Sequence, residues 1–182
     1  MNVPVITTER LILRGHTLAD FEAVYEMWAD PVVVKHIGGK PRTREDSWMR
    51  LQRQVGHWAL LGYGTWAIEE RAGGAYVGGA GIARYERNIT EMTICDYEGG
   101  WVFTAGSHGK GYATEAMTAA LAWFDANYPA TPTECIIDVT NTGSLRVAQK
   151  LGYVEIGRAT YHDDPIIVSR REPAPRAASS AR

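Results

Sequence analysis

The sequence predicts a single α/β (α+β) domain in which helices flank one mixed, mostly antiparallel sheet. Short runs rich in β-branched and aromatic residues alternate with segments in which apolar residues recur every three or four positions. No internal repeat or linker divides the 182 residues, an ordinary length for one domain with one core. We therefore assign residues 1–170 to this domain. Residues 171–182 have few large apolar groups and are expected to form a mobile tail with solvated arginines.

The composition is that of a globular protein without a strong charge. Hydrophobic residues make up 45% of the chain and charged residues 22%, and the formal net charge is -2. This balance provides no global attraction to nucleic acid or to an acidic membrane. No stretch approaches the roughly twenty apolar residues of a membrane helix, and residues 1–10 lack the apolar run of a secretory signal. We expect no nucleic-acid or membrane partner, and either a monomer or a homodimer.

The cysteine and histidine residues indicate neither a disulfide framework nor a metal site. Cys95 and Cys135 are the only cysteines, and each lies in an apolar, strand-like context. This predicts buried thiols in a reducing compartment and therefore a cytoplasmic protein. The five histidines have no paired ligand spacing and no neighbouring cysteine. We expect no bound metal.

The N-terminal half is expected to contain a strand, two helices and a hairpin. Residues 10–14 form a short β-compatible run ended by a glycine. Thr17 and Thr43 are each followed three residues later by an aspartate, the pattern of a capping box that starts a helix. Residues 65–69 and 75–83 are strand-like and separated by a glycine-containing turn, which predicts an antiparallel hairpin.

The C-terminal half is expected to contain the fourth and fifth strands and the helix that connects them. Residues 92–103 are predicted as the fourth strand, with Gly99-Gly100 in its middle, where a bulge or a splay would fit. An apolar stripe predicts a helix over residues 113–128, which a proline then ends. Residues 134–139 have the composition of an interior parallel strand, so this unit should be a right-handed crossover.

A last helix and two short strands should close the domain. Asn141 or Thr142 can cap the helix, and Gly152 has the position of a left-handed C-terminal residue. Residues 154–156 and 166–168 are then the closing strands.

Residues 107–116, with the sequence SHGKGYATEA, are the clearest functional signal. Gly109 and Gly111 lead directly into the alanine-rich helix. The first N–H groups of a helix have no intrahelical partner and carry partial positive charge, so a phosphate or pyrophosphate is a natural ligand there. Glycine allows such a group to approach the backbone closely. The alternative is a tight loop before an ordinary core helix.

Three stretches in this order and spacing resemble the GNAT superfamily of N-acetyltransferases, and within it the Rim-type branch of ribosomal-protein N-terminal acetyltransferases. They are residues 8–14, residues 98–116, and Asn141-Thr142-Gly143-Ser144 with the following residues 150–153. The resemblance covers residue 7 to about residue 170. It implies a GNAT-like domain with a splay between the fourth and fifth strands, and acetyl-CoA as the cosubstrate.

The resemblance also implies which residues bind acetyl-CoA. The family pattern Gln/Arg-x-x-Gly-x-Gly/Ala has His108 at its first position here, which departs from the usual side chain. Mainly through backbone donors, the loop and first helical turn would clasp the pyrophosphate, and the fourth strand and Asn141 would bind and orient the pantetheine arm. The residues with these implied roles are Trp101, Val102, Phe103, His108, Gly109, Lys110, Gly111, Tyr112, Ala113, Thr114 and Asn141.

Transfer of an acetyl group to an amine requires a neutral amine, a polarised thioester carbonyl and a protonated leaving thiolate. The Rim-type pattern has a Glu at this spacing from the glycine loop, so the resemblance implies that Glu98 is the base, acting directly or through water. Asp96, two residues earlier, is the weaker candidate for this base. The alternative for Glu98 is that it is simply an exposed carboxylate on a strand. A strand N–H near Val102 or Phe103 would polarise the carbonyl.

The family pattern Asn-x-x-Ser implies that Ser144 lies near the sulfur and donates a proton or a hydrogen bond to the thiolate. Helix capping is the alternative role of both Asn141 and Ser144. Tyr153 and Tyr161 are alternative donors.

The leading hypothesis is an acetyl-CoA-dependent N-acetyltransferase that acts on a primary amine by direct attack in a ternary complex. The resemblance favours a protein N-terminal α-amine, and a small-molecule amine is the other possibility. Acceptor specificity is expected in residues 32–41, the two N-terminal helices and residues 161–165. The rival hypothesis is an acyl-CoA-binding regulatory module without catalysis, which would show no amine-dependent thiol release.

Overall fold

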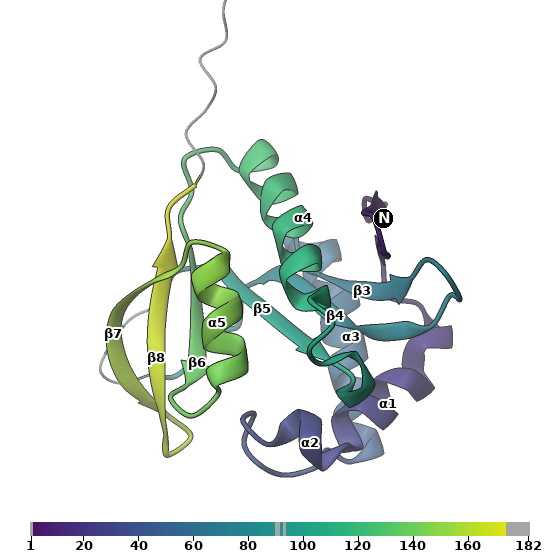
Figure 1. The fold of residues 1–182 in the computed structure, drawn as a ribbon, viewed down its shortest axis with the longest axis horizontal. Coiled ribbons are helices and arrows are strands. Elements are labelled where there is room, and N and C mark those ends of the chain that lie inside the picture. Colours follow the sequence, from purple (N-terminus) through teal and green to yellow (C-terminus); the bar gives the residue numbers. More distant parts are fainter. Residues whose placement is uncertain (1, 90–91, 93, 174–182) are drawn as a thin grey trace, which may run out of the picture.

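The computed structural model describes residues 2–89, 92 and 94–173. Figure 1 shows a central sheet whose two halves diverge, with helices packed along it. The strands follow the order β1-β2-β3-β4-β5-β6-β8-β7. Their bounds are β1 Ile6–Thr7, β2 Leu11–Arg14, β3 Thr65–Glu70, β4 Tyr76–Ala83, β5 Glu98–Phe103, β6 Thr133–Asp138, β7 Val154–Tyr161 and β8 Asp164–Arg171.

The helices are α1 Phe21–Ala29, α2 Pro31–Val34, α3 Arg44–Leu61, α4 Tyr112–Asn127 and α5 Thr142–Lys150. Short 3₁₀ turns precede α1 at Leu18–Asp20 and α4 at Ala105–Ser107. Both predicted capping boxes are present, at Thr17 and at Thr43. Among the described residues, no helix is both long enough and apolar enough to cross a membrane.

The predicted architecture, a single mixed and mostly antiparallel sheet with a splay between the strand before the long helix and the strand after it, is confirmed. β4 pairs with β5 along six residues, whereas the parallel contact of β5 with β6 is restricted to Glu98 opposite Glu134. Beyond Glu98 the two strands separate. In Figure 1, β6, β8, β7 and α5 lie on one side of this opening, and β2–β5 with α1–α3 lie on the other.

The prediction that a strand runs over residues 92–103 is wrong in its extent. β5 begins at Glu98, and the described residues before it, 92 and 94–97, are irregular. The apolar side chains of Met92 and Ile94 pack against β7 and β8, and these residues do not pair as part of β5. Gly99 and Gly100 therefore lie at the start of the strand, and their pairing with β4 contains no bulge.

One buried cluster lies between α4 and the sheet, and a second lies among α1, α2 and α3. The buried side of α4 consists of Ala116, Met117, Ala120, Leu121 and Phe124, which matches the predicted stripe. This packing fixes where the N-terminal turn of α4 lies relative to β5. Figure 1 shows that turn close to the C-terminal end of β5.

The closing strands are longer than predicted, and one arginine assigned to the tail belongs to the domain. β7 and β8 form a paired hairpin of eight residues each, because the ladder continues through polar residues outside the apolar triplets, such as Arg158 opposite Ile167 and Val154 opposite Arg170. Arg171 ends β8 and forms two hydrogen bonds with Asp125, of 3.0 and 2.6 Å, so it is not simply solvated. Residues 174–182 of the predicted tail lie outside the described residues.

The two cysteines are free. Cys135 lies in β6 and is buried, as predicted, whereas Cys95 is half-buried and lies outside any strand.

Candidate active site

One edge of β5 is open where the strands separate. The Tyr97 carbonyl accepts from Glu134 on β6, and the Thr104 N–H donates to Val77 on the β4 side. The backbone N–H and C=O groups of successive residues point to opposite sides of a strand. Those of Gly99, Trp101 and Phe103 therefore point toward the opening. By the same alternation, the N–H of Val102 points to β4. Of the two expected oxyanion donors, only Phe103 therefore has its N–H on the open edge.

The glycine loop is exposed and shaped by two left-handed residues. Gly109 and Gly111 have φ angles of 76° and 81°, which an L-residue with a side chain rarely adopts. A Cβ at Gly109 would meet no atom within 4 Å, so the space beside the loop is open. Gly111 is the N-terminal cap of α4, and the first intrahelical bond reaches it from Glu115. The intervening amides of Tyr112, Ala113 and Thr114 have no intrahelical acceptor and remain available to an anion.

Side chains from the N-terminal segment hold the loop in place. Arg10 donates to the Lys110 carbonyl at 2.8 Å and to the Glu115 carboxylate at 2.7 Å. Thr8 donates to the same carboxylate at 2.6 Å. These contacts neutralise the one acidic side chain in the first turn of α4, so that its charge does not oppose an anion at the loop.

The side chains predicted to bind at the loop already have partners within the protein. The Nε2 atom of His108 lies 3.0 Å from the Phe103 carbonyl, which ties the end of β5 to the beginning of the loop. Tyr112 donates to Glu70 at 2.7 Å, and the Lys110 ammonium lies 3.7 Å from the same carboxylate. Recognition of a pyrophosphate here would therefore depend mainly on backbone N–H groups.

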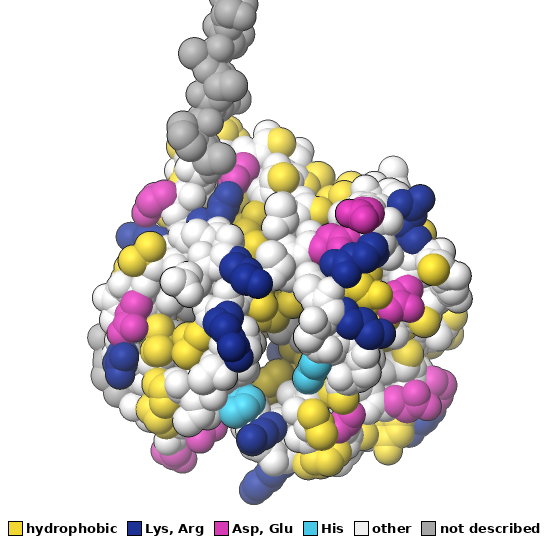
Figure 2. Space-filling model, viewed as in Figure 1, with side chains coloured by type: hydrophobic (Ala, Val, Ile, Leu, Met, Phe, Trp, Pro, Cys, Tyr) yellow, Lys and Arg dark blue, Asp and Glu magenta, His cyan; other side chains and the backbone are white. Residues whose placement is uncertain are grey.

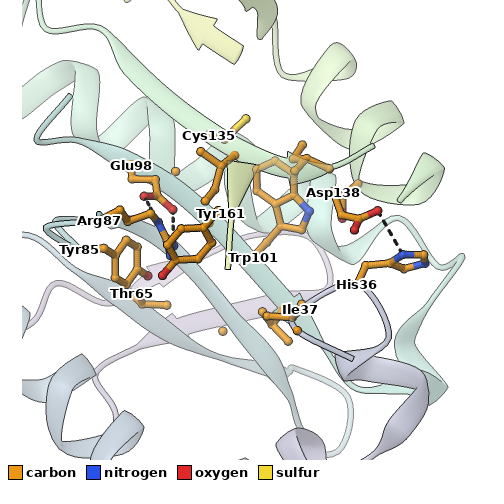
Figure 3. Close-up of a pocket in the computed structure, with 18 of the residues that line it drawn as sticks. His36, Ile37, Thr65, Tyr85, Arg87, Glu98, Trp101, Cys135, Asp138 and Tyr161 are labelled. Atoms are coloured by element: carbon orange, nitrogen blue, oxygen red, sulfur yellow. Dashed lines mark hydrogen bonds and ion pairs between the residues drawn. The ribbon is translucent and has the colours of Figure 1, made fainter. Parts of the chain in front are cut away.

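Glu98 is buried, contrary to the alternative of an exposed strand carboxylate, and is paired with an arginine that the sequence did not indicate. Its side chain is 6% exposed and accepts two hydrogen bonds of 2.6 Å from Arg87. Arg87 lies between the rings of Tyr85 and Tyr161, at 4.6 and 4.8 Å from their centroids. Burial raises the pKa of the Glu98 carboxyl above its ordinary value although Arg87 opposes the shift. Figure 3 shows these four side chains together.

Asp96 is a poor alternative to Glu98. Its side chain is 57% exposed and lies 3.3 Å from Arg84, a partner outside the opening.

Asn141 and Ser144 lie at the N-terminus of α5, across the opening from β5. The Asn141 side chain accepts from the Ser144 N–H at 3.0 Å, which is the capping role given above as the alternative. Both residues also line the cavity in the opening. The capping role therefore does not remove Ser144 from the cavity wall.

The two tyrosines considered as donors differ in position. Tyr153 is buried and shares a hydrogen bond of 2.9 Å with Thr133, and a Cβ at Gly99 would lie 2.4 Å from its hydroxyl. Burial also raises the pKa of Tyr153. Tyr161 lines the cavity, so it is the better placed of the two.

The opening contains a cavity of about 340 Å³ that extends from the splayed strands to the N-terminal helices. Trp101 and Val102 line it from β5, whereas Phe103 is buried in the core. Figure 2 shows the hollow at the surface, with Lys, Arg and His side chains around it between hydrophobic and uncharged groups. On its far wall, His36 lies 3.7 Å from Asp138 (Figure 3). Within the described part of the chain, no three His, Cys, Asp or Glu side chains gather as metal ligands would.

The cavity also contains residues that the sequence analysis missed. α3 contributes Arg50, Arg53, Gln54 and His57, and the segment after β4 contributes Tyr85 and Arg87. The spacing 50, 53, 54, 57 is a helical stripe of polar residues, which could have been detected as a second face of the predicted helix. No local pattern marks Arg87.

Comparison with known proteins agrees with this geometry. Residues 10–154 match the family described as the acetyltransferase (GNAT) domain. The Bacillus subtilis (strain 168) protein YnaD, named an uncharacterized N-acetyltransferase, is 30% identical over 147 residues, which are 81% of this chain and 81% of that protein. The crystal structure of an acetyltransferase from Agrobacterium tumefaciens str. C58 superposes with a TM-score of 0.79 at 27% identity, covering 93% of this chain and 95% of that one.

The Rim-type branch has weaker support. The ribosomal-protein-S5-alanine acetyltransferase of Vibrio fischeri superposes with a TM-score of 0.67, covering 94% of this chain and 97% of that one, but shares 14% of residues. Such a likeness extends to the fold alone, so membership in this branch stays a prediction. The family match itself spans most of the chain, from β2 to the start of β7. The chain therefore belongs to the GNAT family of acetyltransferases.

Proposed function

We propose that the protein transfers an acetyl group from acetyl-CoA to a primary amine by direct attack within a ternary complex. The observation that carries this proposal is the continuity of the opening. The glycine loop, the free edge of β5 and the cavity containing Glu98 follow one another along a single strand and the turn after it. Acetyl-CoA would supply an activated thioester, held by the loop amides and by the backbone of Trp101 and Phe103.

The cavity residues have the chemistry that this transfer requires. The amine nitrogen must lose a proton before it bonds to the carbonyl carbon, and Glu98 can accept that proton, directly or through water. As the carbon–sulfur bond breaks, the thiolate must gain a proton or a hydrogen bond, and Ser144 or Tyr161 can donate it. N–H groups on the free edge of β5 would stabilise the developing oxyanion. An acceptor that begins as an ammonium loses two protons in becoming the amide: one is balanced by the proton that the thiol gains, and the other is released to solvent.

The proposed acceptor is a protein N-terminal α-amine or a small-molecule amine. The resemblance to the Rim-type pattern favours the first, and the name of the Vibrio fischeri neighbour is consistent with it. The size and lining of the cavity favour the second, as developed below.

The test follows free thiol while acetyl-CoA is mixed with a panel of amines and peptides. Amine-dependent thiol release supports transfer, whereas binding of acetyl-CoA without it would favour a regulatory module. Glu98→Gln should lower turnover and remove the part of the rise of activity with pH that comes from the carboxyl, because the carboxyl acts as a base only when it is deprotonated. Glu155→Gln changes an exposed carboxylate on β7 and is the matched control. Full turnover of Glu98→Gln at every pH would remove Glu98 as the base.

A further inference from the structure

The polar stripe of α3 that lines the cavity carries two arginines. Arg50 and Arg53 are three residues apart and therefore project from the same side of the helix, with His57 one turn further on. The Arg50 guanidinium lies 4.0 Å from the centroid of the Trp28 ring, and Arg53 lies 5.3 Å from that of Tyr85. These aromatic contacts hold the guanidinium groups at the cavity wall without neutralising them.

The cavity has more cations than carboxylates to pair with them. Among its carboxylates, Glu98 is engaged by Arg87, and Asp138 lies beside His36. Asp164, on the hairpin, is exposed to solvent.

Three arginines of the lining have no such partner. Within the residues that the structure describes, no carboxylate lies within 4.0 Å of Arg42, Arg50 or Arg53. Among the described residues, the Arg42 side chain donates only to the backbone carbonyl of Ile37, at 2.7 Å. The cavity therefore has an excess of positive charge.

Several buried polar atoms of the same wall also lack partners. The Trp28 indole N–H, the Arg42 Nε–H and the His57 Nδ1 atom have no hydrogen-bond partner among the described residues, although Trp28 and His57 are only 5% and 8% exposed. A buried donor without an acceptor is unfavourable, so such groups usually indicate a missing ligand or water. Burial, with smaller effects from Arg53 and Arg42, lowers the pKa of Arg50 to about 10. An anion in the cavity would accept hydrogen bonds from the unpartnered donors and would favour the charged form of Arg50.

We propose that the acceptor is a small amine that also carries a carboxylate, which binds to Arg42, Arg50 and Arg53 while its amino group faces Glu98. The inference rests on the proposed acetyl transfer and names its substrate class. A volume of about 340 Å³ is near the lower end of small-molecule sites, which are roughly 300 to 1,000 Å³. A polyamine would place further positive charge beside unpaired arginines and is disfavoured.

The experiment compares amines that differ only in the carboxylate. Each of several amino acids and ω-amino carboxylates is paired with the decarboxylated amine of the same skeleton, and spermidine is included. We expect kcat/KM to be about 10- to 100-fold higher for the amino carboxylate of a pair, the range of one or two charge-assisted hydrogen bonds. Efficient acetylation of the decarboxylated amines or of spermidine, with the carboxylates slower, overturns the inference but leaves acetyl transfer intact.

Variants identify the groups that make the selection. Arg50→Gln and Arg53→Gln should each raise KM for the amino carboxylate about 10-fold or more and leave the decarboxylated amine nearly unchanged. Arg44→Gln is the matched control, because Arg44 is also on α3 but is exposed and pairs with Glu22 outside the cavity. Equal effects of all three variants on both members of each pair would contradict the assignment.

A binding measurement keeps the inference testable if no amine in the panel is acetylated. In the presence of CoA, amino carboxylates should raise the midpoint of thermal unfolding in a saturable way, and Arg50→Gln should abolish the rise. That result would support an anion-binding pocket while counting against the proposed transfer. No stabilisation of the wild type by any amino carboxylate overturns the inference.

Discussion

Replacing Arg87 by methionine tests whether Glu98 is held as a buried, ionised carboxylate. The two side chains are 19% and 6% exposed and share two hydrogen bonds of 2.6 Å. Methionine keeps an unbranched stem but removes both donors, so the carboxylate stays buried without a counter-charge. Breaking such a pair costs about 3 to 5 kcal/mol, a large part of the roughly 5 to 15 kcal/mol by which folded domains are stable.

The loss of stability should depend on pH. Burial already raises the pKa of the Glu98 carboxyl in the wild type, and without Arg87 nothing of comparable strength opposes that effect. When a carboxyl has a higher pKa in the folded protein than in the unfolded chain, stability falls as the pH rises from the unfolded value, about 4.3, through the folded value. The variant should therefore be closer to the wild type near about pH 5 than near about pH 8.

Urea unfolding followed by circular dichroism measures this difference. Arg158→Met is the control, because it makes the same substitution in a pair with Glu155 whose side chains are 67% and 46% exposed. This control should unfold like the wild type at both pH values, since exposed pairs contribute little. Equal unfolding free energies for Arg87→Met and the wild type near about pH 8 would refute the reasoning.

Three further predictions concern the splay, the loop and the N-terminal segment. In Gly99→Ala, the new Cβ would lie 2.4 Å from the Tyr153 hydroxyl, so urea denaturation should show a loss of about 1 to 3 kcal/mol. Gly111→Ala forces a residue with a side chain into a φ of 81°, a conformation that costs about 1 kcal/mol. Titration calorimetry should therefore show a Kd for CoA about fivefold higher. Burial acts to raise the pKa of the Asp20 carboxyl, but hydrogen bonds from Arg14 and from Thr17 have the larger combined effect. The Asp20 carboxyl therefore has a pKa below its ordinary value. The stability it provides is present above the ordinary pKa and is lost as the pH falls through the folded one, so Asp20→Asn should differ from the wild type at neutral pH and converge with it below about pH 4 in urea unfolding.

The changes at Gly111 and Asp20 each have an internal check. Gly106→Ala, beside the same loop, meets no atom within 4 Å and has no left-handed φ, so it should leave both stability and CoA binding unchanged. If Gly106→Ala weakened CoA binding as much as Gly111→Ala, the conformational explanation would not hold. A constant difference between Asp20→Asn and the wild type down to the lowest pH would contradict the assigned pKa shift.

Local signals explain why many elements could be predicted. A capping box joins residues three positions apart, so Thr17 and Thr43 indicated the helix starts without any knowledge of the sheet. The buried stripe of α4 and the glycine loop before it are likewise local patterns. The start of β5 is not local. Ile94 has the apolar character of a strand residue, but the outer hairpin decides where it packs.

The sequence by itself determined the glycine turn that begins α4, because glycine conformation and helix N-terminal chemistry depend on a few consecutive residues. Only the tertiary structure decided which charges meet in the cavity. Glu98 pairs with Arg87, eleven residues away in the sequence, whereas nearby Arg84 pairs with Asp96. Arg50 faces the same cavity from another layer of the fold. Electrostatic energy depends on distance and burial, and neither quantity is encoded in the spacing of residues along the chain.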